Sequence, residues 1–405
     1  MPGRVRLKIL VIDEEFPYPL NTGKRIRTFS LTKSLTRYND VSYLAYGSPA
    51  QDSFKFIESN GITCHAVPPP DRGQYGPAFY WRLFANLFSD LPYIVTSHHT
   101  GRYADKLREL QAAHGYDLVI CEWTPYAMFL KALDGVKSIV VAHNIESNIW
   151  RRYEQNESNP FKRKYISIQR KKVENFERKC FAWSSGATAV SDIEAEEIAA
   201  FGVNYPVQTI ENGVDTSYFA PIETVVDPNT LVFTGSMDWR PNQDAIEFFA
   251  AEIFPKVKAI RPEARVIVVG RRPPEHIREL GKTDGITITG TVEDVRPYIA
   301  GAALYVVPLR VGGGSRLKIL EAMGMQKPVL STSVGAEGLE VTDGEDIVIA
   351  DGAQQFADSI LRCLDNQTAM SKMAEAGHRL VEKQYRWESL GEKLDRYLAE
   401  VVARP

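Results

Sequence analysis

The part of the chain best suited to chemistry is a glycine-rich segment followed by two cations. Gly312, Gly313, Gly314 and Ser315 come after an apolar, β-branched run that ends at Pro308, and Arg316 and Lys318 follow them at the start of a helix-forming stretch. Glycines let the backbone approach a ligand, and a helix start offers unpaired N–H groups and a positive dipole end. Cations at such a position oppose the dipole, so they indicate a compensating anion. We therefore expect a phosphate or diphosphate to bind here.

Glu321 follows about one and a half turns into the same predicted helix, within reach of polar groups on the same ligand. A diphosphate that carries a sugar would fit this set of residues. The plainer alternative is a glycine turn that packs a helix on a sheet, with Arg316 and Lys318 solvated. In either case we expect Leu317, Ile319 and Leu320 to be buried.

Polar side chains also follow predicted strands in the first half of the chain. We expect them at the carboxyl edge of a parallel sheet, which is where ligands bind in open α/β folds. A lone histidine is more often structural, but the position of His143 next to Asn144 and Glu146 favours a functional role. The residues concerned are Asp13, Glu14, Glu15, Glu122, Trp123 and His143.

Alternation of short strands and helices must position these residues. Apolar runs predict strands at 8–12, 41–46, 63–67, 117–122, 138–142 and 187–190, and again at 231–235, 265–270, 286–290, 304–308, 328–332 and 346–350. Strands that alternate with helices imply parallel βαβ units and a doubly wound α/β sheet. Two Rossmann-like halves are expected, with a cleft between them. The looser segment 216–229, with Pro221 and Pro228, is the predicted linker.

Bulk composition excludes several classes of protein. The 405 residues suffice for two domains, and the formal net charge of −3 argues against a general nucleic-acid binder. The four cysteines are widely spaced, without a CxxC pair, which favours reduced buried thiols in a cytoplasmic protein and no metal site. No stretch is apolar enough to span a membrane. Neither half has a GxGxxG with a downstream acid, which disfavours a dinucleotide oxidoreductase.

Two segments have alternative interpretations as surfaces. Apolar residues recur at helical spacing in 80–91, which predicts a face packed on the sheet, or alternatively a surface for a lipid-linked or apolar acceptor. Residues 151–180 carry ten Lys or Arg against four Glu. Within this segment, Arg170-Lys-Lys172 and Arg178-Lys179 fall in a predicted long helix together with Ile166, Ile168, Val173 and Phe176. A solvated helix face is the first interpretation, and contact with an anionic membrane is the second.

Several motifs in their order along the chain resemble the GT-B glycosyltransferases of family 4. In the first half and at the hinge, the similar segments are His143-Asn-Ile-Glu146 and Glu211-Asn-Gly-Val-Asp215. In the second half they are Thr234-Gly-Ser236, Arg240-Pro-Asn242, Gly290-Thr-Val-Glu-Asp294, Gly312–Glu321 and Pro328-Val-Leu-Ser-Thr332. The resemblance covers nearly the whole chain and is strongest over 205–340.

The resemblance implies a retaining transferase that moves a sugar from a nucleoside-diphosphate sugar to a glycan or lipid-linked acceptor, without cofactor or essential metal. It implies an acceptor-binding domain at 1–214, joined by a C-terminal crossover helix at 386–405, and a donor-binding domain at 215–385. The family signature is Glu, seven residues, Glu. Glu321 matches the second position, which holds ribose hydroxyls, whereas Gly313 replaces the first, so Arg316, Lys318 and the glycine backbone would take over its work.

Further roles also come from the resemblance. His143 would orient the donor sugar and stabilise the oxocarbenium-like state. Gly23 and Lys24 match the family's first glycine loop, and Thr291 and Val292 the nucleobase edge. Gly235 and Arg240 fall in donor-side motifs, and Glu15 and Glu122 are the expected acceptor contacts.

Two other functions stay open. Asp13, Glu14, Glu15 and Glu122 could serve acid–base chemistry in a GT-B-like nucleotide-sugar epimerase or hydrolase. The glycine at position 313 keeps open a non-catalytic nucleotide-sugar-binding subunit. The donor base, sugar and acceptor are not named by the sequence.

Overall fold

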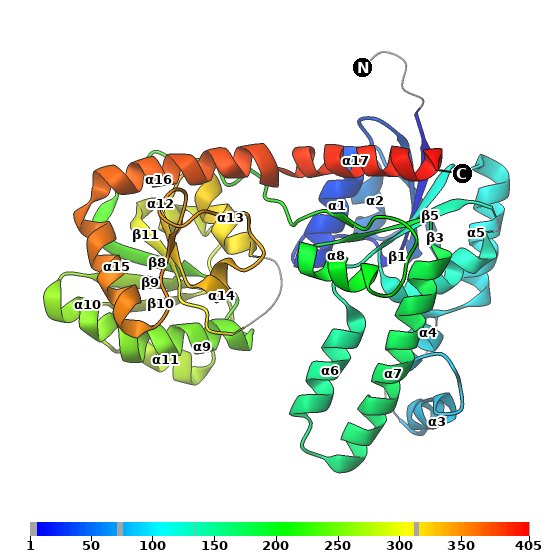
Figure 1. Cartoon of the computed structure of the whole chain (residues 1–405), viewed down its shortest axis with the longest axis horizontal. Helices are drawn as coiled ribbons and strands as arrows, with labels where there is room; N and C mark the ends of the chain where they lie inside the picture. Colours follow the sequence, from blue (N-terminus) through cyan, green and yellow to red (C-terminus); the bar gives the residue numbers. More distant parts are fainter. Residues whose placement is uncertain (1–5, 71–75, 134, 312–315, 405) are drawn as a thin grey trace. The chain divides into compact units, whose positions relative to one another are not determined.

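The computed structural model describes residues 6–70, 76–133, 135–311 and 316–404. The chain forms two compact units (Figure 1). Unit 1 comprises 1–211 and 390–405, and unit 2 comprises 212–389. The chain thus passes between the units at 211–212 and at 389–390, while the predicted linker 216–229 lies wholly within unit 2.

Unit 1 is built on a parallel sheet with strand order β3-β2-β1-β4-β5-β6-β7. Chain order reverses between β1 and β4, which places a topological switch point, the usual ligand site of such sheets, at their carboxyl ends. The strands are β1 (Lys8–Glu15), β2 (Asp40–Tyr46), β3 (Thr63–Val67), β4 (Leu118–Cys121), β5 (Lys137–Val141), β6 (Gly186–Ala189) and β7 (Gln208–Thr209).

Helices cover both faces of this sheet, and Val119, Val140 and Phe181 belong to the core that they enclose. They are α1 (Gly23–Leu35), α2 (Asp52–Ser59), α3 (Pro77–Asn86), α4 (Tyr93–His98), α5 (Gly101–His114), the 3-10 helix η1 (Thr124–Ala132), α6 (Glu146–Asn156), α7 (Pro160–Trp183) and α8 (Asp192–Ala199). Thr22 caps α1 and Ser191 caps α8 through side-chain hydrogen bonds, as Ser and Thr do at helix starts.

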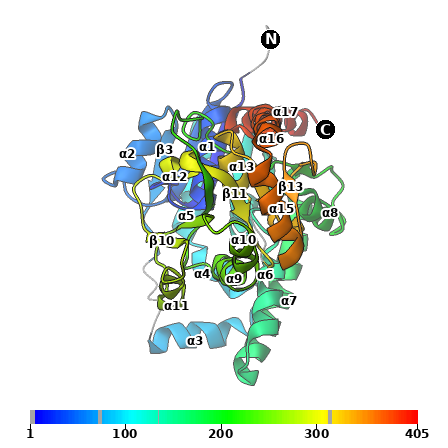
Figure 2. The same cartoon turned by 90° about the vertical axis from the view of Figure 1, so that its left-hand side faces the viewer.

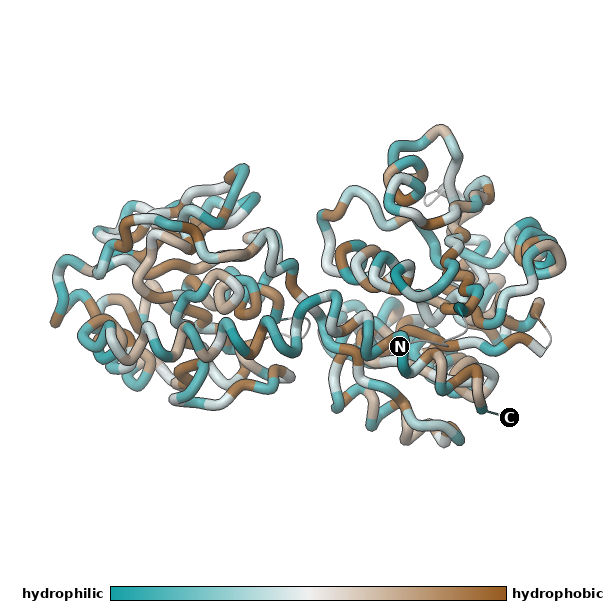
Figure 3. Tube along the Cα trace, turned by 90° about the horizontal axis from the view of Figure 1, so that it is seen from above, coloured by the Kyte–Doolittle hydropathy of each residue, from teal (hydrophilic) through white to brown (hydrophobic). Residues whose placement is uncertain are grey.

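Unit 2 repeats the plan with the parallel order β10-β9-β8-β11-β12-β13. The strands are β8 (Asp227–Thr234), β9 (Arg265–Val269), β10 (Ile286–Gly290), β11 (Ala302–Val307), β12 (Val329–Ser331) and β13 (Val348–Ile349). The helices are α9 (Arg240–Phe248), η2 (Phe249–Ile253), α10 (Phe254–Ile260), α11 (Glu275–Leu280), α12 (Arg296–Gly301), α13 (Leu317–Gly324), α14 (Ser333–Ala336), α15 (Ala353–Asp365), α16 (Gln367–Leu380) and η3 (Val381–Tyr385). The outer helices of both units alternate hydrophilic and hydrophobic residues along their length (Figure 3).

The last helix, α17 (Trp387–Ala403), starts in unit 2 and ends in unit 1. In unit 1 its Asp395 accepts a hydrogen bond from Asn39 (2.7 Å), and Tyr397 accepts one from the amide of Ala187 (3.0 Å). Trp387 is buried before the crossing. The fold is therefore two Rossmann-like α/β units with a C-terminal helix that returns to the first, as the sequence predicted.

One helical expectation needs correction. The prediction that the apolar residues of 80–91 pack on the sheet is wrong for Tyr80, Phe84 and Phe88, which are exposed. The long helix predicted around residues 166–179 is confirmed as α7, which forms a hairpin with α6, and α3 lies beside this hairpin (Figures 1 and 2). Lys172 is not simply solvated, because its Nζ donates to the backbone oxygen of Asn86 (2.6 Å).

Candidate active site

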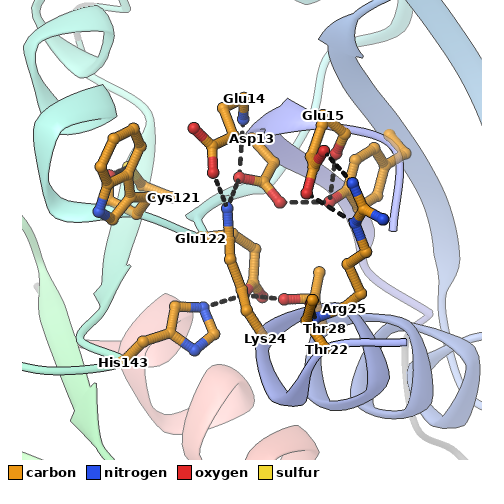
Figure 4. Close-up of polar contacts among 12 residues, drawn as sticks. Asp13, Glu14, Glu15, Thr22, Lys24, Arg25, Thr28, Cys121, Glu122 and His143 are labelled. Carbon is orange, nitrogen blue, oxygen red and sulfur yellow. Dashed lines mark hydrogen bonds and ion pairs between the residues drawn. The ribbon is translucent and has the colours of Figure 1, made fainter. Parts of the chain in front are cut away.

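In unit 1, a chain of charged side chains gathers where β1 ends and α1 begins (Figure 4). Lys24 Nζ lies 2.8 Å from Asp13 Oδ1 and 2.8 Å from Glu14 Oε1. Lys24 comes from the first turn of α1, whose start at Gly23 turns the chain back toward the strand end. The two neighbouring carboxylates raise the pKa of Lys24 although burial opposes the shift. Lys24 is therefore a fixed cation that is held by two anions.

Asp13 is buried beneath this pair, 1% exposed. Tyr43 donates to its Oδ2 (2.8 Å), and the backbone N–H of Glu14 donates to its Oδ1 (2.7 Å). Burial raises the pKa of Asp13, and Lys24 opposes that shift. These contacts hold one carboxylate rigidly, whereas Glu14, at the strand end, is only partly buried.

Glu122 and His143 form the second part of the cluster. His143 Nε2 lies 3.1 Å from Glu122 Oε2, and Thr28 donates to the same oxygen (2.9 Å). Burial alone would raise the pKa of Glu122, but the hydrogen bonds of His143 and Thr28 and the charge of Arg27 outweigh it and lower the pKa. Glu122 is thus an anion that fixes the imidazole of His143. Glu122 was predicted to contact the acceptor, and in the structure its carboxylate is hydrogen-bonded to His143.

Glu146 lies close by, at the start of α6. Its Oε1 accepts from Trp123 Nε1 (2.9 Å), and burial raises its pKa. Glu177 of α7 caps α6, because its carboxylate accepts the backbone N–H groups of Glu146 (2.7 Å) and Ser147 (3.2 Å). Burial raises the pKa of Glu177 to about 7. The loop after His143 is therefore anchored to the α6–α7 hairpin.

Glu15, the other predicted acceptor contact, is held by Arg25 through two hydrogen bonds (2.8 and 2.6 Å). Asn144 beside His143 is exposed. The two hydrogen bonds to Arg25 do not connect Glu15 with Glu122 and His143.

In unit 2, the helix α13 begins shortly after the glycine segment. The predicted donor contacts in that segment, Gly312, Gly313, Gly314 and Ser315, lie outside the described residues. Arg316 occupies the N-cap position of α13. Its side chain is only 5% exposed, and its Nη2 lies 3.1 Å from Glu337 Oε2. The expectation of a compensating anion is met in part by the protein itself. The alternative of a solvated Arg316 is wrong.

Lys318 contacts two side chains, Asn242 of α9 and Phe233 of β8. Its Nζ donates to Asn242 Oδ1 (2.7 Å) and lies 4.2 Å from the centre of the Phe233 ring. Asn242 in turn donates to the backbone oxygen of Ser236 (2.8 Å). A Cβ at Gly235 would lie 2.9 Å from Lys318 Nζ and 2.7 Å from Asn242 Nδ2, so only glycine leaves room for both.

Burial governs the protonation of this site. It lowers the pKa of Lys318 to about 7 and raises that of Glu321 to about 7. Each shift is opposed by the charge of the other residue. A partly buried cation whose hydrogen-bond acceptor is a neutral amide is suited to an anionic ligand.

A pocket of about 400 Å³ lies at the carboxyl ends of β9 and β10. Thr291 lines it together with Arg272, Arg278 and Ile288, while Val292 packs on the core of unit 2. Arg240 is an exposed residue at the start of α9. Among the described residues, no group of three His, Cys, Asp or Glu side chains is arranged to hold a metal ion.

Sequence reasoning missed several members of both clusters. Tyr43, Thr28 and Glu177 reach the site from β2, α1 and α7 and carry no local motif. Asn242 stood in a recognised motif, but nothing in the sequence pairs it with Lys318, 76 residues further on.

Each half of the chain matches a different family model. The family model "Glycosyltransferase Family 4" matches residues 97–218, and the model "Glycosyl transferases group 1" matches 228–366. Both halves of the chain are glycosyltransferase domains, and the fold is GT-B. A sucrose-phosphate synthase from Thermosynechococcus elongatus has the same fold, with a TM-score of 0.67 at 17% identity over 98% of this chain and all of its own.

The chain is also similar in sequence to two bacterial proteins. The glycosyltransferase is 23% identical over 393 residues to an uncharacterised 44.6 kDa protein in the cps region of Klebsiella pneumoniae, covering 93% of this chain and 96% of the relative. It is 25% identical over 224 residues to a GDP-mannose-dependent phosphatidylinositol monomannoside mannosyltransferase of Corynebacterium glutamicum, covering 49% and 58% respectively. Among solved structures, Anabaena Alr3699/HepE in complex with UDP and glucose has a TM-score of 0.63 at 13% identity and covers 97% of this chain and all of its own.

No helix of the described residues is both long and apolar enough to cross a bilayer.

Proposed function

We propose that this glycosyltransferase is a retaining enzyme of family 4 that transfers a sugar from a nucleoside-diphosphate sugar to a glycan or lipid-linked acceptor in polysaccharide or glycoconjugate biosynthesis. The observation that carries the proposal is the partly buried Lys318, held by Asn242 next to a glycine at position 235, at the start of a helix that also presents Arg316. Two cations at a helix start are an arrangement suited to a diphosphate.

The comparisons support a nucleotide sugar as donor. The Corynebacterium relative uses GDP-mannose according to its name, and the Anabaena structure contains UDP and glucose. In our proposal Glu321 accepts hydrogen bonds from ribose hydroxyls, and the pocket beside Thr291 takes the base. Arg240 and the glycine segment 312–315 contribute further contacts to the diphosphate.

Breaking the glycosyl–phosphate bond places negative charge on the leaving diphosphate. In the proposed mechanism Arg316 and Lys318 stabilise this charge, and they are already fixed by Glu337 and Asn242, so little reorganisation is needed at the moment of reaction. Lys318 takes up a proton as the anion binds, because its pKa of about 7 rises beside a diphosphate.

Unit 1 supplies the acceptor side in this proposal. Glu122 orients the imidazole of His143 (3.1 Å), which then positions the donor sugar and stabilises an oxocarbenium-like state. Lys24 and Gly23 are assigned to donor phosphates. Glu14, Glu15 and Glu146 provide carboxylates for acceptor hydroxyls.

We further propose that transfer requires no metal and that the enzyme works in the cytoplasm, with the basic segment 151–180 in contact with an anionic membrane. Free, buried cysteines at all four positions support a reducing compartment. Activity that is retained after exhaustive treatment with a chelator is the expected result, and loss with recovery on addition of Mg²⁺ would contradict metal independence.

A panel of UDP and GDP sugars provides the first test. The correct donor should raise the melting temperature, because a ligand that binds the native state stabilises it. Transfer of the sugar from that donor to a defined acceptor, with retained anomeric configuration by NMR, is the expected second result. Epimerised or hydrolysed donor without transfer would favour the epimerase or hydrolase, and binding without any turnover would favour a non-catalytic subunit.

A further inference from the structure

Helix α3 presents an aromatic surface that the core of unit 1 does not use. Three ring-bearing side chains of α3, Tyr80, Trp81 and Phe84, are 68%, 68% and 51% exposed, and Phe88 just after the helix is 81% exposed. Positions 81, 84 and 88 follow helical spacing, and their rings touch in sequence, with centroids 5.7 and 5.6 Å apart. Such a contiguous exposed patch marks an interaction surface in water-soluble domains.

The exposure of these rings is not a result of a loose helix. Asn86, at the last turn of α3, is 6% exposed, and it accepts a hydrogen bond from Gln169 of α7 (2.9 Å). Lys172 of α7 donates to the backbone oxygens of Asn86 (2.6 Å) and Leu87 (3.2 Å), which satisfies carbonyls at the end of α3. The α6–α7 hairpin thus holds α3 by its C-terminal end and leaves its aromatic face outward.

The tip of that hairpin carries exposed cations and two more exposed rings. Lys162, Arg163 and Lys164 are exposed in the first turn of α7. Phe161 beside them is 86% exposed, and Tyr153 of α6 is 59% exposed. Two acids lie near this tip. Glu154 of α6 is 2.7 Å from Arg170 and so is already paired, and Glu157 in the loop accepts the backbone N–H of Asn159 (2.8 Å). The tip and α3 lie at the same end of unit 1 (Figures 1 and 2).

We propose that α3 and the tip of the α6–α7 hairpin together dock unit 1 on an anionic lipid bilayer. Trp, Tyr and Phe favour the boundary between headgroups and acyl chains, and Lys and Arg are attracted to anionic headgroups. The aromatic face of α3 inserts and the hairpin cations contact phosphates. Residues 151–180 contain ten basic and four acidic residues, next to the aromatic face of α3. A bilayer with anionic headgroups requires both features, whereas a protein partner would not.

This docking surface extends the membrane contact that we propose for 151–180, and it adds the apolar element that a basic segment lacks. Its consequence for function, that acceptors are met at the bilayer, rests on the proposed transferase activity. Docking itself does not, since it can be measured without donor or acceptor.

The experiment is co-sedimentation of the full chain with vesicles of phosphatidylcholine alone and of phosphatidylcholine mixed with phosphatidylglycerol. We expect binding to the mixed vesicles. The triple variant Trp81→Ser, Phe84→Ser, Phe88→Ser should lower the partition coefficient about tenfold or more, because it removes the inserting rings. The triple variant Lys162→Gln, Arg163→Gln, Lys164→Gln should bind both vesicle types equally and weakly. The matched control Ile260→Ser removes an exposed apolar side chain of unit 2 (69% exposed) and should bind as the wild type does.

Tryptophan fluorescence gives a second measurement. The chain has six tryptophans, so the Trp81 signal is obtained by difference from a Trp81→Phe variant, which keeps an apolar ring. Quenching by brominated lipids that disappears in this variant, while its vesicle binding persists, places Trp81 in the bilayer.

Two further outcomes would contradict the docking proposal. An aromatic variant that binds like the wild type would overturn the role of α3. A wild-type protein that does not bind vesicles but forms dimers, which dissociate in the aromatic variant, would assign the patch to a second copy of the chain.

Donor-induced thermal stabilisation should be equal in all variants. Its retention when vesicle binding fails would reject the docking alone, and its absence from the wild type would instead reject the donor assignment.

Discussion

Lys318 is the residue whose environment most directly couples binding to protonation. It is a partly buried lysine beside an aromatic ring, and its acceptor is the neutral amide of Asn242 and not a carboxylate. Burial lowers its pKa to about 7, so the ligand-free protein loses this cation as the pH rises above neutrality. A diphosphate favours the charged form and must therefore recruit a proton at higher pH.

This coupling predicts a pH dependence of donor affinity. Between pH 7 and 8.5, the dissociation constant of the nucleotide sugar should increase with pH, approaching about tenfold per pH unit when a single proton is taken up. Titration calorimetry measures this slope. The variant Lys318→Met should bind weakly with no slope in this range, and an unchanged slope in that variant would assign the titration to another group.

The two cations also make a kinetic prediction. Arg316→Ala and Lys318→Ala should each cost about 2–4 kcal/mol of transition-state stabilisation, that is, about 30- to 1000-fold in kcat/KM. Lys256→Ala, at an exposed position of α10, is the matched control and should retain activity. Near-normal transfer by the double variant would reject the assignment of these residues to the diphosphate.

At the scale of elements, α13 positions Lys318 by packing on the sheet of unit 2. Its residues Ile319, Leu320 and Met323 are fully buried. Leu317 is only partly buried, which corrects the expectation that all apolar residues at the helix start are core. The first turn of α13 is therefore anchored by its polar residues as much as by apolar ones.

This difference predicts unequal costs of truncation. Leu320→Ala should lower the free energy of unfolding of unit 2 by about 2–5 kcal/mol, since it leaves a cavity in the core. Leu317→Ala should cost less than about 2 kcal/mol, because water already reaches part of that side chain. Chemical denaturation followed by circular dichroism tests the order, and equal losses would contradict the burial described for α13.

At the scale of the whole molecule, the end of the chain stabilises its beginning. Residues 390–403 of α17 pack on the rest of unit 1, where Leu394, Leu398 and Val401 are buried. The fit is close, because a Cβ at Gly391 would lie 2.3 Å from Ser34 Cβ on α1. The core of unit 1 therefore includes side chains of α17.

Substitution at this contact should affect unit 1 selectively. Gly391→Ala should destabilise unit 1 by about 1–3 kcal/mol through overpacking, although alanine favours helices. Gly301→Ala, at the end of α12 where no atom lies near an added Cβ, is the control and should change stability little. Hydrogen exchange resolved by peptide separates the units, and faster exchange confined to unit 2 would contradict the expected contact.

Much of this protein was determined by local sequence. Strands such as 63–67 and 286–290 were predicted at their observed bounds, because β-branched runs between turn residues specify strands over a few residues. The alternation of strands and helices specified parallel sheets. Positions just after strands predicted Glu122 and His143 as site residues, and the glycine segment before a helix start predicted Lys318. These are short-range signals, and a single sequence contains them.

Only the tertiary structure decided which of these side chains meet. Glu122 and His143 follow the neighbouring strands β4 and β5. Lys318 of α13 meets Asn242 of α9, and Glu337 pairs with Arg316 from another loop. The exposure of α3 was also decided there. Its apolar spacing predicts a buried face, but whether a face is buried depends on what the rest of the chain places against it, and here α7 holds only the end of the helix. Contacts between distant residues depend on the packing of all elements at once, which no local pattern encodes.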